Sequence, residues 1–138
     1  MRILSMDVGD RRIGMAISDA LGWTAQGIAT LERRNNLYDF DKIKEVIEKH
    51  NPDRIVVGLP KNMNGTLGPQ SEKVKEFADK LNASFGLEII YWDERLTTVS
   101  AHKMMIEADV RRDKRKQKVD QIAAVLILQS YLDLINRK

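Results

Sequence analysis

The chain has 138 residues, a formal net charge of +3 and no cysteine. This length predicts one domain over residues 1–138, and the lack of cysteine excludes disulfides, thiolate zinc sites and cysteine nucleophiles. Only His50 and His102 could supply an imidazole, and no apolar run is long enough to span a membrane. The N-terminal segment meets an acid at Asp7, which does not fit a secretory signal, so we expect a cytoplasmic protein.

Three strands are predicted at the start of the chain. Residues 2–7 form an apolar run that ends on an acid, and residues 13–18 and 26–31 form two further runs. The intervening loops, including Gly9-Asp10-Arg11, are short. Short loops favour hairpins, so we expect these strands to pair antiparallel.

Helices and strands alternate in the remainder. In chain order, we predict a helix around residues 40–47, a strand over 54–60, a helix around 74–81 and a strand over 87–92. Apolar spacings of three, four and seven residues indicate the helices, and the β-branched run at 54–60 is typical of a central parallel strand.

Two more helices complete the prediction. One begins at Thr97 or Thr98, either of which could be its N-cap, and runs to about Ala108. The last follows a basic loop at residues 111–118 and places on one face Val119, Ile122, Ala123, Leu126 and Ile127. The result is an α/β fold with a mixed five-stranded sheet flanked by helices.

Three acids occupy informative positions in this layout. Asp7 ends the first strand, Glu94 follows the fifth, and Asp120 lies in the last helix. Ligands of open α/β sheets bind beyond the carboxyl ends of the strands, where these acids could meet. Each acid also has a structural alternative, because Asp7 could cap the turn at Gly9, Glu94 could cap a helix, and Asp120 could offset its basic neighbours.

Carboxylates gathered in this way suit hard divalent cations. Mg²⁺ and Mn²⁺ take oxygen ligands, and two such ions can stabilise the attacking and leaving oxygens of a phosphoryl displacement. The sequence therefore predicts a site for Mg²⁺ or Mn²⁺ at Asp7, Glu94 and Asp120.

Basic side chains indicate a nucleic-acid partner. Residues 111–118 hold six basic side chains and one acid, a net charge of +5, which fits either a solvated loop or a phosphate contact. The loop after the fourth strand and the segment after the fifth offer further donors. The candidate nucleic-acid contacts are Arg11, Lys61, Asn62, Arg95, Arg111, Arg112, Lys114, Arg115, Lys116 and Lys118. A salt bridge to Asp93 is the structural alternative for Arg95.

Four ordered motifs resemble the YqgF/RuvX family over nearly the whole chain. They are DVGDRRIG at 7–14 with Ser18-Asp19, VGLP at 57–60 with Asn64-Gly65, DERLTT at 93–98, and KVD at 118–120 with Ala123-Ala124. The resemblance implies an RNase H-like fold with helices on both faces of the sheet. It also implies a nuclease that matures the 5′ end of pre-16S ribosomal RNA, with Asp7, Glu94 and Asp120 as its catalytic acids.

One departure separates this chain from the related RuvC-type resolvases. Those enzymes carry their second acid on the fourth strand, which here reads Val56-Val57-Gly58-Leu59. The YqgF/RuvX resemblance moves that role to Glu94.

Three other functions stay open at this stage. A resolvase of four-way DNA would need a dimer to cut two strands, and the sequence does not distinguish a monomer from a homodimer. An ATP-binding module of the sugar kinase and actin class needs two lobes, and this chain has length for one. A non-catalytic RNA-binding factor for ribosome assembly would keep the basic residues without needing the acids.

Overall fold

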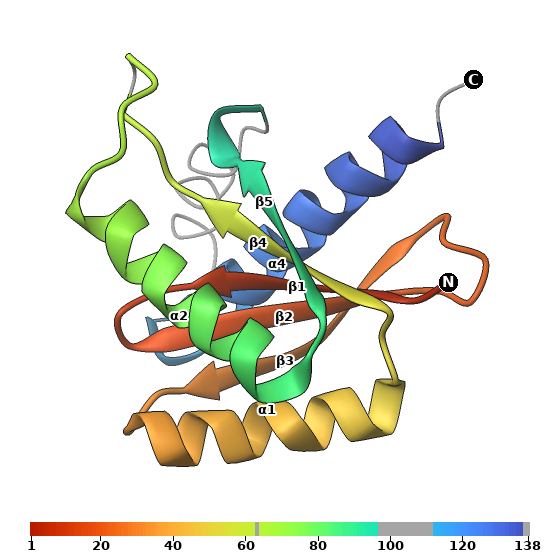
Figure 1. Cartoon of the computed structure of the whole chain (residues 1–138), viewed down its shortest axis with the longest axis horizontal. Helices are drawn as coiled ribbons and strands as arrows, with labels where there is room; N and C mark the ends of the chain where they lie inside the picture. Colours follow the sequence, from red (N-terminus) through yellow and green to blue (C-terminus); the bar gives the residue numbers. More distant parts are fainter. Residues whose placement is uncertain (63, 97–111, 137–138) are drawn as a thin grey trace.

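The computed structural model describes residues 1–62, 64–96 and 112–136, with the backbone alone over residues 112–120. Its centre is a five-stranded sheet in the order β3-β2-β1-β4-β5 (Figure 1). The strands are β1 (Ile3–Val8), β2 (Arg12–Ser18), β3 (Ala25–Glu32), β4 (Arg54–Leu59) and β5 (Glu88–Asp93). β2 is antiparallel to β1 and β3, while β4 is parallel to both β1 and β5. The predicted antiparallel hairpins and mixed sheet are confirmed.

Helices α1 (Asn36–His50) and α2 (Pro69–Phe85) join the strands, and α4 (Arg112–Ile135) ends the fold. The side chain of Asn35 caps α1 by accepting a hydrogen bond from the amide of Tyr38, as N-cap residues do. Asn51 ends this helix in a left-handed conformation with φ 52°. The following Pro52 cannot continue it, as the sequence predicted.

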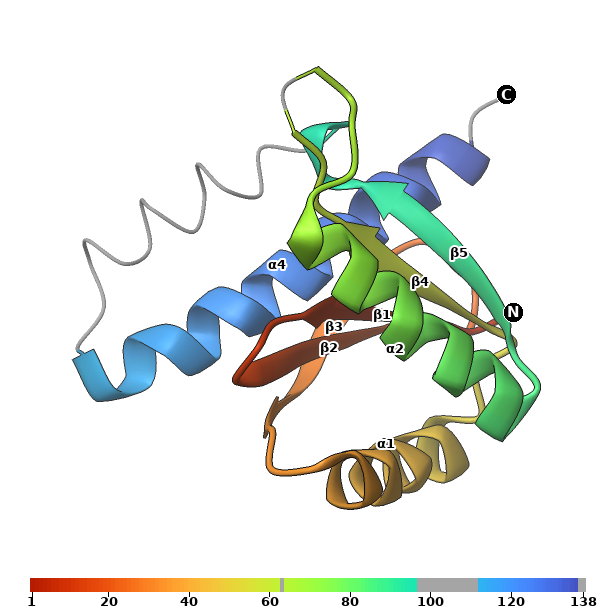
Figure 2. The same ribbon diagram turned by 60° about the vertical axis from the view of Figure 1, so that its left-hand side comes forward.

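The sheet separates two layers of helices. Leu4, Met6 and Val8 of β1 point into the core shared with α1 and α2, whereas Ile3 packs in the core formed with α4. This alternation follows from the two-residue period of a strand. Figures 1 and 2 show α1 and α2 on one face of the sheet and α4 on the other.

The last helix differs from its prediction in two ways. The expected loop at 111–118 is wrong over residues 112–118, which belong to α4; Arg111 lies outside the described residues. Arg, Lys and Gln are good helix formers, and a long helix anchored by its apolar part can extend through a charged run. The buried stripe is also rotated, because Ala124 and Leu128 are fully buried while Ile122 and Leu126 are half-buried.

The predicted helix from Thr97 or Thr98 to Ala108 lies outside the described residues, as does His102. Within the part of the chain that the structure describes, no helix is long and apolar enough to cross a bilayer.

Candidate active site

Asp7 lies near the carboxyl end of the central strand, on the face that α4 covers. Ser5, two residues earlier on that face, donates a hydrogen bond of 2.7 Å from Oγ to the carbonyl of Ala124 in α4. Asp7 is 7% exposed. The first acid is therefore buried between the sheet and α4, at the edge where β1, β4 and β5 all end.

Glu94 reaches the same face from the other side of β4. It begins the short 3₁₀ helix η1 (Glu94–Leu96) directly after β5. A Cβ built on Gly58 of β4 would lie 2.9 Å from Oε1 of Glu94 and 2.5 Å from Cδ1 of Ile127 in α4. The carboxylate of Glu94 therefore lies over Gly58, on the face where α4 packs.

The register of the sheet brings Gly58 next to Asp7. The pairing of β1 with β4 ends at Met6 opposite Val57, so Asp7 and Gly58 are the next positions on neighbouring strands. A glycine inside a strand often marks a close approach of another group, and here that group is Glu94. The structure thus places the carboxylate of Glu94 over β4, the strand next to the one that carries Asp7, on the same face of the sheet.

The backbone of α4 carries Asp120 toward this edge. Ala124 contacts Ser5, and about two turns later Tyr131 accepts a hydrogen bond of 3.1 Å from Arg54, the register partner of Ile3. The helix therefore runs opposite to β1. Residue 120 lies about 6 Å before Ala124 along the helix, and Asp7 lies about 6.7 Å beyond Ser5 along the strand. The side chain of Asp120 is outside what the structure describes.

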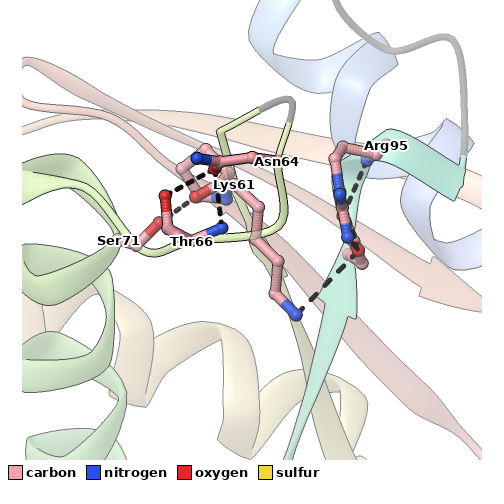
Figure 3. A network of polar contacts seen from close by, with 7 residues as sticks. Lys61, Asn64, Thr66, Ser71 and Arg95 are labelled. Atoms are coloured by element: carbon pink, nitrogen blue, oxygen red, sulfur yellow. Dashed lines mark hydrogen bonds and ion pairs between the residues drawn. The ribbon is translucent and has the colours of Figure 1, made fainter.

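Asp93 has a different role from its neighbour Glu94. Its carboxylate accepts hydrogen bonds from the backbone and the guanidinium of Arg95, the shortest being 2.7 Å from Nη2. The Nζ of Lys61 lies 3.9 Å away (Figure 3). The hydrogen bonds from the Arg95 side chain lower the pKa of Asp93, although partial burial opposes them. Asp93 therefore holds Lys61 and Arg95 close together, and the salt bridge considered for Arg95 is present.

The loop after β4 packs against this cationic pair. The side-chain amide of Asn62 donates to the hydroxyl of Thr66, whose backbone and hydroxyl both donate to Asn64. A Cβ on Gly65, where φ is +85°, would lie 3.4 Å from Nη1 of Arg95. Figure 3 shows Asn64 and Thr66 grouped close to Lys61. Asn62, expected to contact nucleic acid, has a hydrogen bond that closes the loop.

The other candidate contacts are spread along the same edge. Arg11 is exposed in the β1–β2 turn, where its carbonyl accepts a hydrogen bond from the amide of Arg33. The basic residues from Arg112 to Lys118 lie in the N-terminal third of α4. Among the side chains that the structure describes, no three acids or histidines are grouped closely enough to hold a metal ion; Asp120 is not among them.

Sequence reasoning missed Gly58, which gives Glu94 the space to cross β4. The available signal was a glycine interrupting the β-branched run Val56-Val57-Gly58-Leu59, since such a glycine indicates a bulge or a close contact. What approached it could not be read from the sequence, because Glu94 and Ile127 are distant along the chain.

Comparison with known proteins gives a family match over residues 1–134, to the model described as RuvX, Holliday junction resolvase. A protein of Clostridium tetani named "Putative pre-16S rRNA nuclease" is 62% identical over 138 residues, which is all of both chains. A relative of the same name from Thermoanaerobacter pseudethanolicus is 56% identical over 134 residues and 96% of each chain.

Solved structures support the fold. RuvC of T. thermophilus in complex with a Holliday junction matches with a TM-score of 0.60 and 11% identity, over all of this chain and 98% of the other. The Fowlpox virus resolvase bound to junction DNA matches with a TM-score of 0.56 and 15% identity, over 99% and 100% of the two chains. The fold is therefore the RNase H-like fold of these resolvases.

Proposed function

We propose, from the premise that this chain belongs to the RuvX family, that it is a metal-dependent endonuclease that processes the 5′ end of pre-16S ribosomal RNA. Relatives at 56–62% identity, matched over their full lengths or nearly so, are named "Putative pre-16S rRNA nuclease". The observation that supports the chemistry is the position of the Glu94 carboxylate over Gly58 of β4, the strand that pairs with the one carrying Asp7. A cytoplasmic location and one functional domain over residues 1–138 are parts of the same proposal.

The residues at this edge fit a hard divalent cation. Asp7 and Glu94 offer only carboxylate oxygens, the ligands that Mg²⁺ and Mn²⁺ prefer, and the backbone of α4 adds Asp120. We propose these three residues as the metal ligands. When bound there, Mg²⁺ or Mn²⁺ would supply charge stabilisation at the scissile phosphate and favour deprotonation of an attacking water.

The remaining groups would hold the substrate. Lys61 and Arg95, drawn together by Asp93, provide two cations after the same ends of β4 and β5, and a guanidinium can grip phosphate through two N–H groups at once. Arg11 and the basic residues of α4 would extend this positive surface along the path of the bound RNA strand. Hydrolysis would leave a 5′-phosphate and a 3′-hydroxyl.

Cleavage by purified protein tests this function. With Mg²⁺ or Mn²⁺, the wild-type chain should cut a ribosomal precursor, and Asp7→Asn and Glu94→Gln should not. Glu45→Gln is a matched control, because it removes one negative charge from an exposed side chain of α1 and should leave cutting unchanged. Equal cutting by Asp7→Asn and wild type would indicate a contaminant and contradict the proposal.

Resolution of four-way DNA is the second candidate, favoured by the family description and by the junction-bound neighbours. A resolvase cuts two strands symmetrically and needs two active sites, so it predicts a dimer. Light scattering combined with cleavage of a labelled junction distinguishes the two functions. A monomer that cuts the ribosomal precursor and ignores the junction would support the RNA nuclease.

A further inference from the structure

A second cleft lies on the opposite face of the sheet from Asp7. It has a volume of about 410 Å³ and lies between the β1–β2 turn and the N-terminal parts of α1 and α2, which all meet at the left of Figure 1. Its lining is rich in polar and cationic residues: Arg33, Arg34, Asn35, Asn36, Gln70, Lys73 and Lys80, with the acids Asp10, Asp39 and Glu76. A volume of this order suits a small ligand.

Arg33 is fixed in the wall of this cleft. Its Nε donates to Asp39 at 3.1 Å, and its Nη1 donates to the carbonyl of Gly9 at 2.9 Å. The guanidinium also lies over the ring of Phe77, 4.9 Å from its centroid. These contacts leave Nη2 without a hydrogen-bond partner among the described residues, on a side chain that is still 21% exposed. A guanidinium held this rigidly loses little entropy when it binds an anion.

Of the three acids that line the cleft, Asp39 is already neutralised, and Glu76 lies exposed on α2. Asp39 is 1% exposed, and its two oxygens accept hydrogen bonds from the Arg33 side chain and the Arg34 amide. The other ion pair, between Lys73 and Asp10 at 3.6 Å, is about two-thirds exposed on both sides. Exposed pairs of this kind contribute little, so Lys73 can turn to a ligand at small cost.

Several N–H donors remain in the cleft against one further acid, Glu76. Asn35 uses its side-chain oxygen to cap α1, which leaves its amide nitrogen for a ligand. Lys80 has no ion-pair partner among the described residues, and the guanidinium of Arg34 lies over Tyr38 at the rim. Several N–H donors around one space match the oxygens of a phosphate group.

We propose that this cleft binds a phosphate of the RNA strand, with its nucleotide, next to the bond that is cut. This inference rests on the proposed function. Asp7 and Val8 are consecutive residues on opposite faces of β1, and Val8 lines the cleft. A strand that passes over the β1–β2 turn can therefore leave the acids, contact Arg11 and enter the cleft within a short length.

Binding measured without cleavage tests the cleft. The protein carries Asp7→Asn and EDTA is present, so that no RNA is cut. A fluorescent single-stranded RNA is titrated by anisotropy over a series of KCl concentrations. Adding Arg34→Ala and Lys80→Ala should weaken binding and lower the salt slope by about 1 to 2. Neither side chain is buried, so the fold should be retained.

The matched control is Lys44→Ala with Lys49→Ala, which removes the same charge from exposed positions farther along α1. It should leave affinity and slope close to those of the parent. If both pairs of substitutions weakened RNA binding equally, or if neither pair weakened it, the proposal that the cleft binds RNA would be overturned. If precursor cutting still depends on Asp7 in the wild-type background, the proposed function survives that result.

Amide shift mapping identifies the source of the phosphate. Inorganic phosphate, AMP and the RNA are titrated separately, with Asn35, Asn36 and Gln70 as reporters. Shifts with the RNA that AMP reverses support a strand phosphate in the cleft. Shifts with AMP but not with the RNA would mean that the cleft binds a free nucleotide, and would overturn the proposal. The absence of shifts with all three ligands would overturn it as well.

Discussion

Among single residues, Gly58 decides the geometry of the candidate site because it has no side chain. Gly58 is the only position of β4 where Glu94 could pass over the strand toward Asp7, because every other β4 residue on that face carries a side chain. The acid on the fourth strand of RuvC-type enzymes and the acid after the fifth strand here can thus serve the same edge of the sheet. An acid that follows the fifth strand can reach this edge only because β4 has a glycine at position 58.

Gly58→Ala should lower the cleavage rate by about 10²-fold, the usual cost of displacing a catalytic group by an ångström. The new methyl group would contact both Glu94 and Ile127, so unfolding free energy should also fall by about 1–3 kcal/mol. Ile127→Val separates the effects, since valine lacks the Cδ1 atom in contact. The double variant should regain stability in urea while cleavage stays low; recovery of full cleavage would show that Gly58 serves only packing.

The lowered pKa of Asp93 predicts how the stability of the protein depends on pH. Its pKa is lowered mainly by the hydrogen bonds from the Arg95 side chain, so the ionised form is favoured in the fold. The resulting stability is present above the ordinary aspartate pKa of about 3.9 and is lost as pH falls through the lowered value. Asp93→Asn should therefore destabilise the protein at pH 7 and flatten the loss of stability below pH 4, measured by urea unfolding. If Asp93→Asn lost stability below pH 4 as steeply as the wild type does, this role would be contradicted.

At the scale of elements, α4 is aligned with the sheet by a few specific contacts. The hydrogen bond from Ser5 to Ala124 and the edge-to-face contact of Trp92 with Tyr131, whose ring centroids are 6.1 Å apart, connect it to β1 and β5. Because α4 runs opposite to β1, these contacts bring the backbone of residue 120 to the edge that holds the other two acids.

Ser5→Ala should reduce the free energy of unfolding by about 1 kcal/mol, the usual net contribution of one hydrogen bond. Ser130→Ala is the control, because the Ser130 hydroxyl donates to Leu126 within α4 itself and does not tie the helix to the sheet. Only Ser5→Ala should also weaken Mn²⁺ binding, which is measured by calorimetry. Equal metal affinity in the two variants would show that the Ser5 contact does not position α4 for the site.

Most elements were predictable because each follows a local pattern. The three N-terminal strands were identified from short loops and apolar runs, and α1 and α2 from apolar spacing. The N-terminal third of α4 was not, because a dense basic run resembles a solvated loop while the packing that extends the helix comes from residues more distant in the sequence. The buried stripe of α4 was misplaced for the same reason: its burial is set by where β1, β2 and β3 lie.

At the scale of the whole molecule, the sequence located acids but not their neighbours. Asp7 and Glu94 were identified because one lies at the end of a strand and the other follows a strand, and both strands end at one edge. The position of Glu94 over Gly58, the approach of Lys61 to Asp93, and the cleft around Arg33 all depend on which strands lie side by side, whereas the salt bridge of Arg95 to Asp93 is local and was foreseen. Contacts of this kind require the sheet order, which local patterns do not specify.

Anomalous diffraction from a crystal soaked in Mn²⁺ shows whether the three acids hold a metal ion. We expect manganese beside the carboxylates of Asp7 and Glu94, with Asp120 among its ligands, and no manganese there in crystals of Asp7→Asn. Manganese bound only elsewhere, or retained unchanged at this edge in the Asp7→Asn protein, would contradict this expectation.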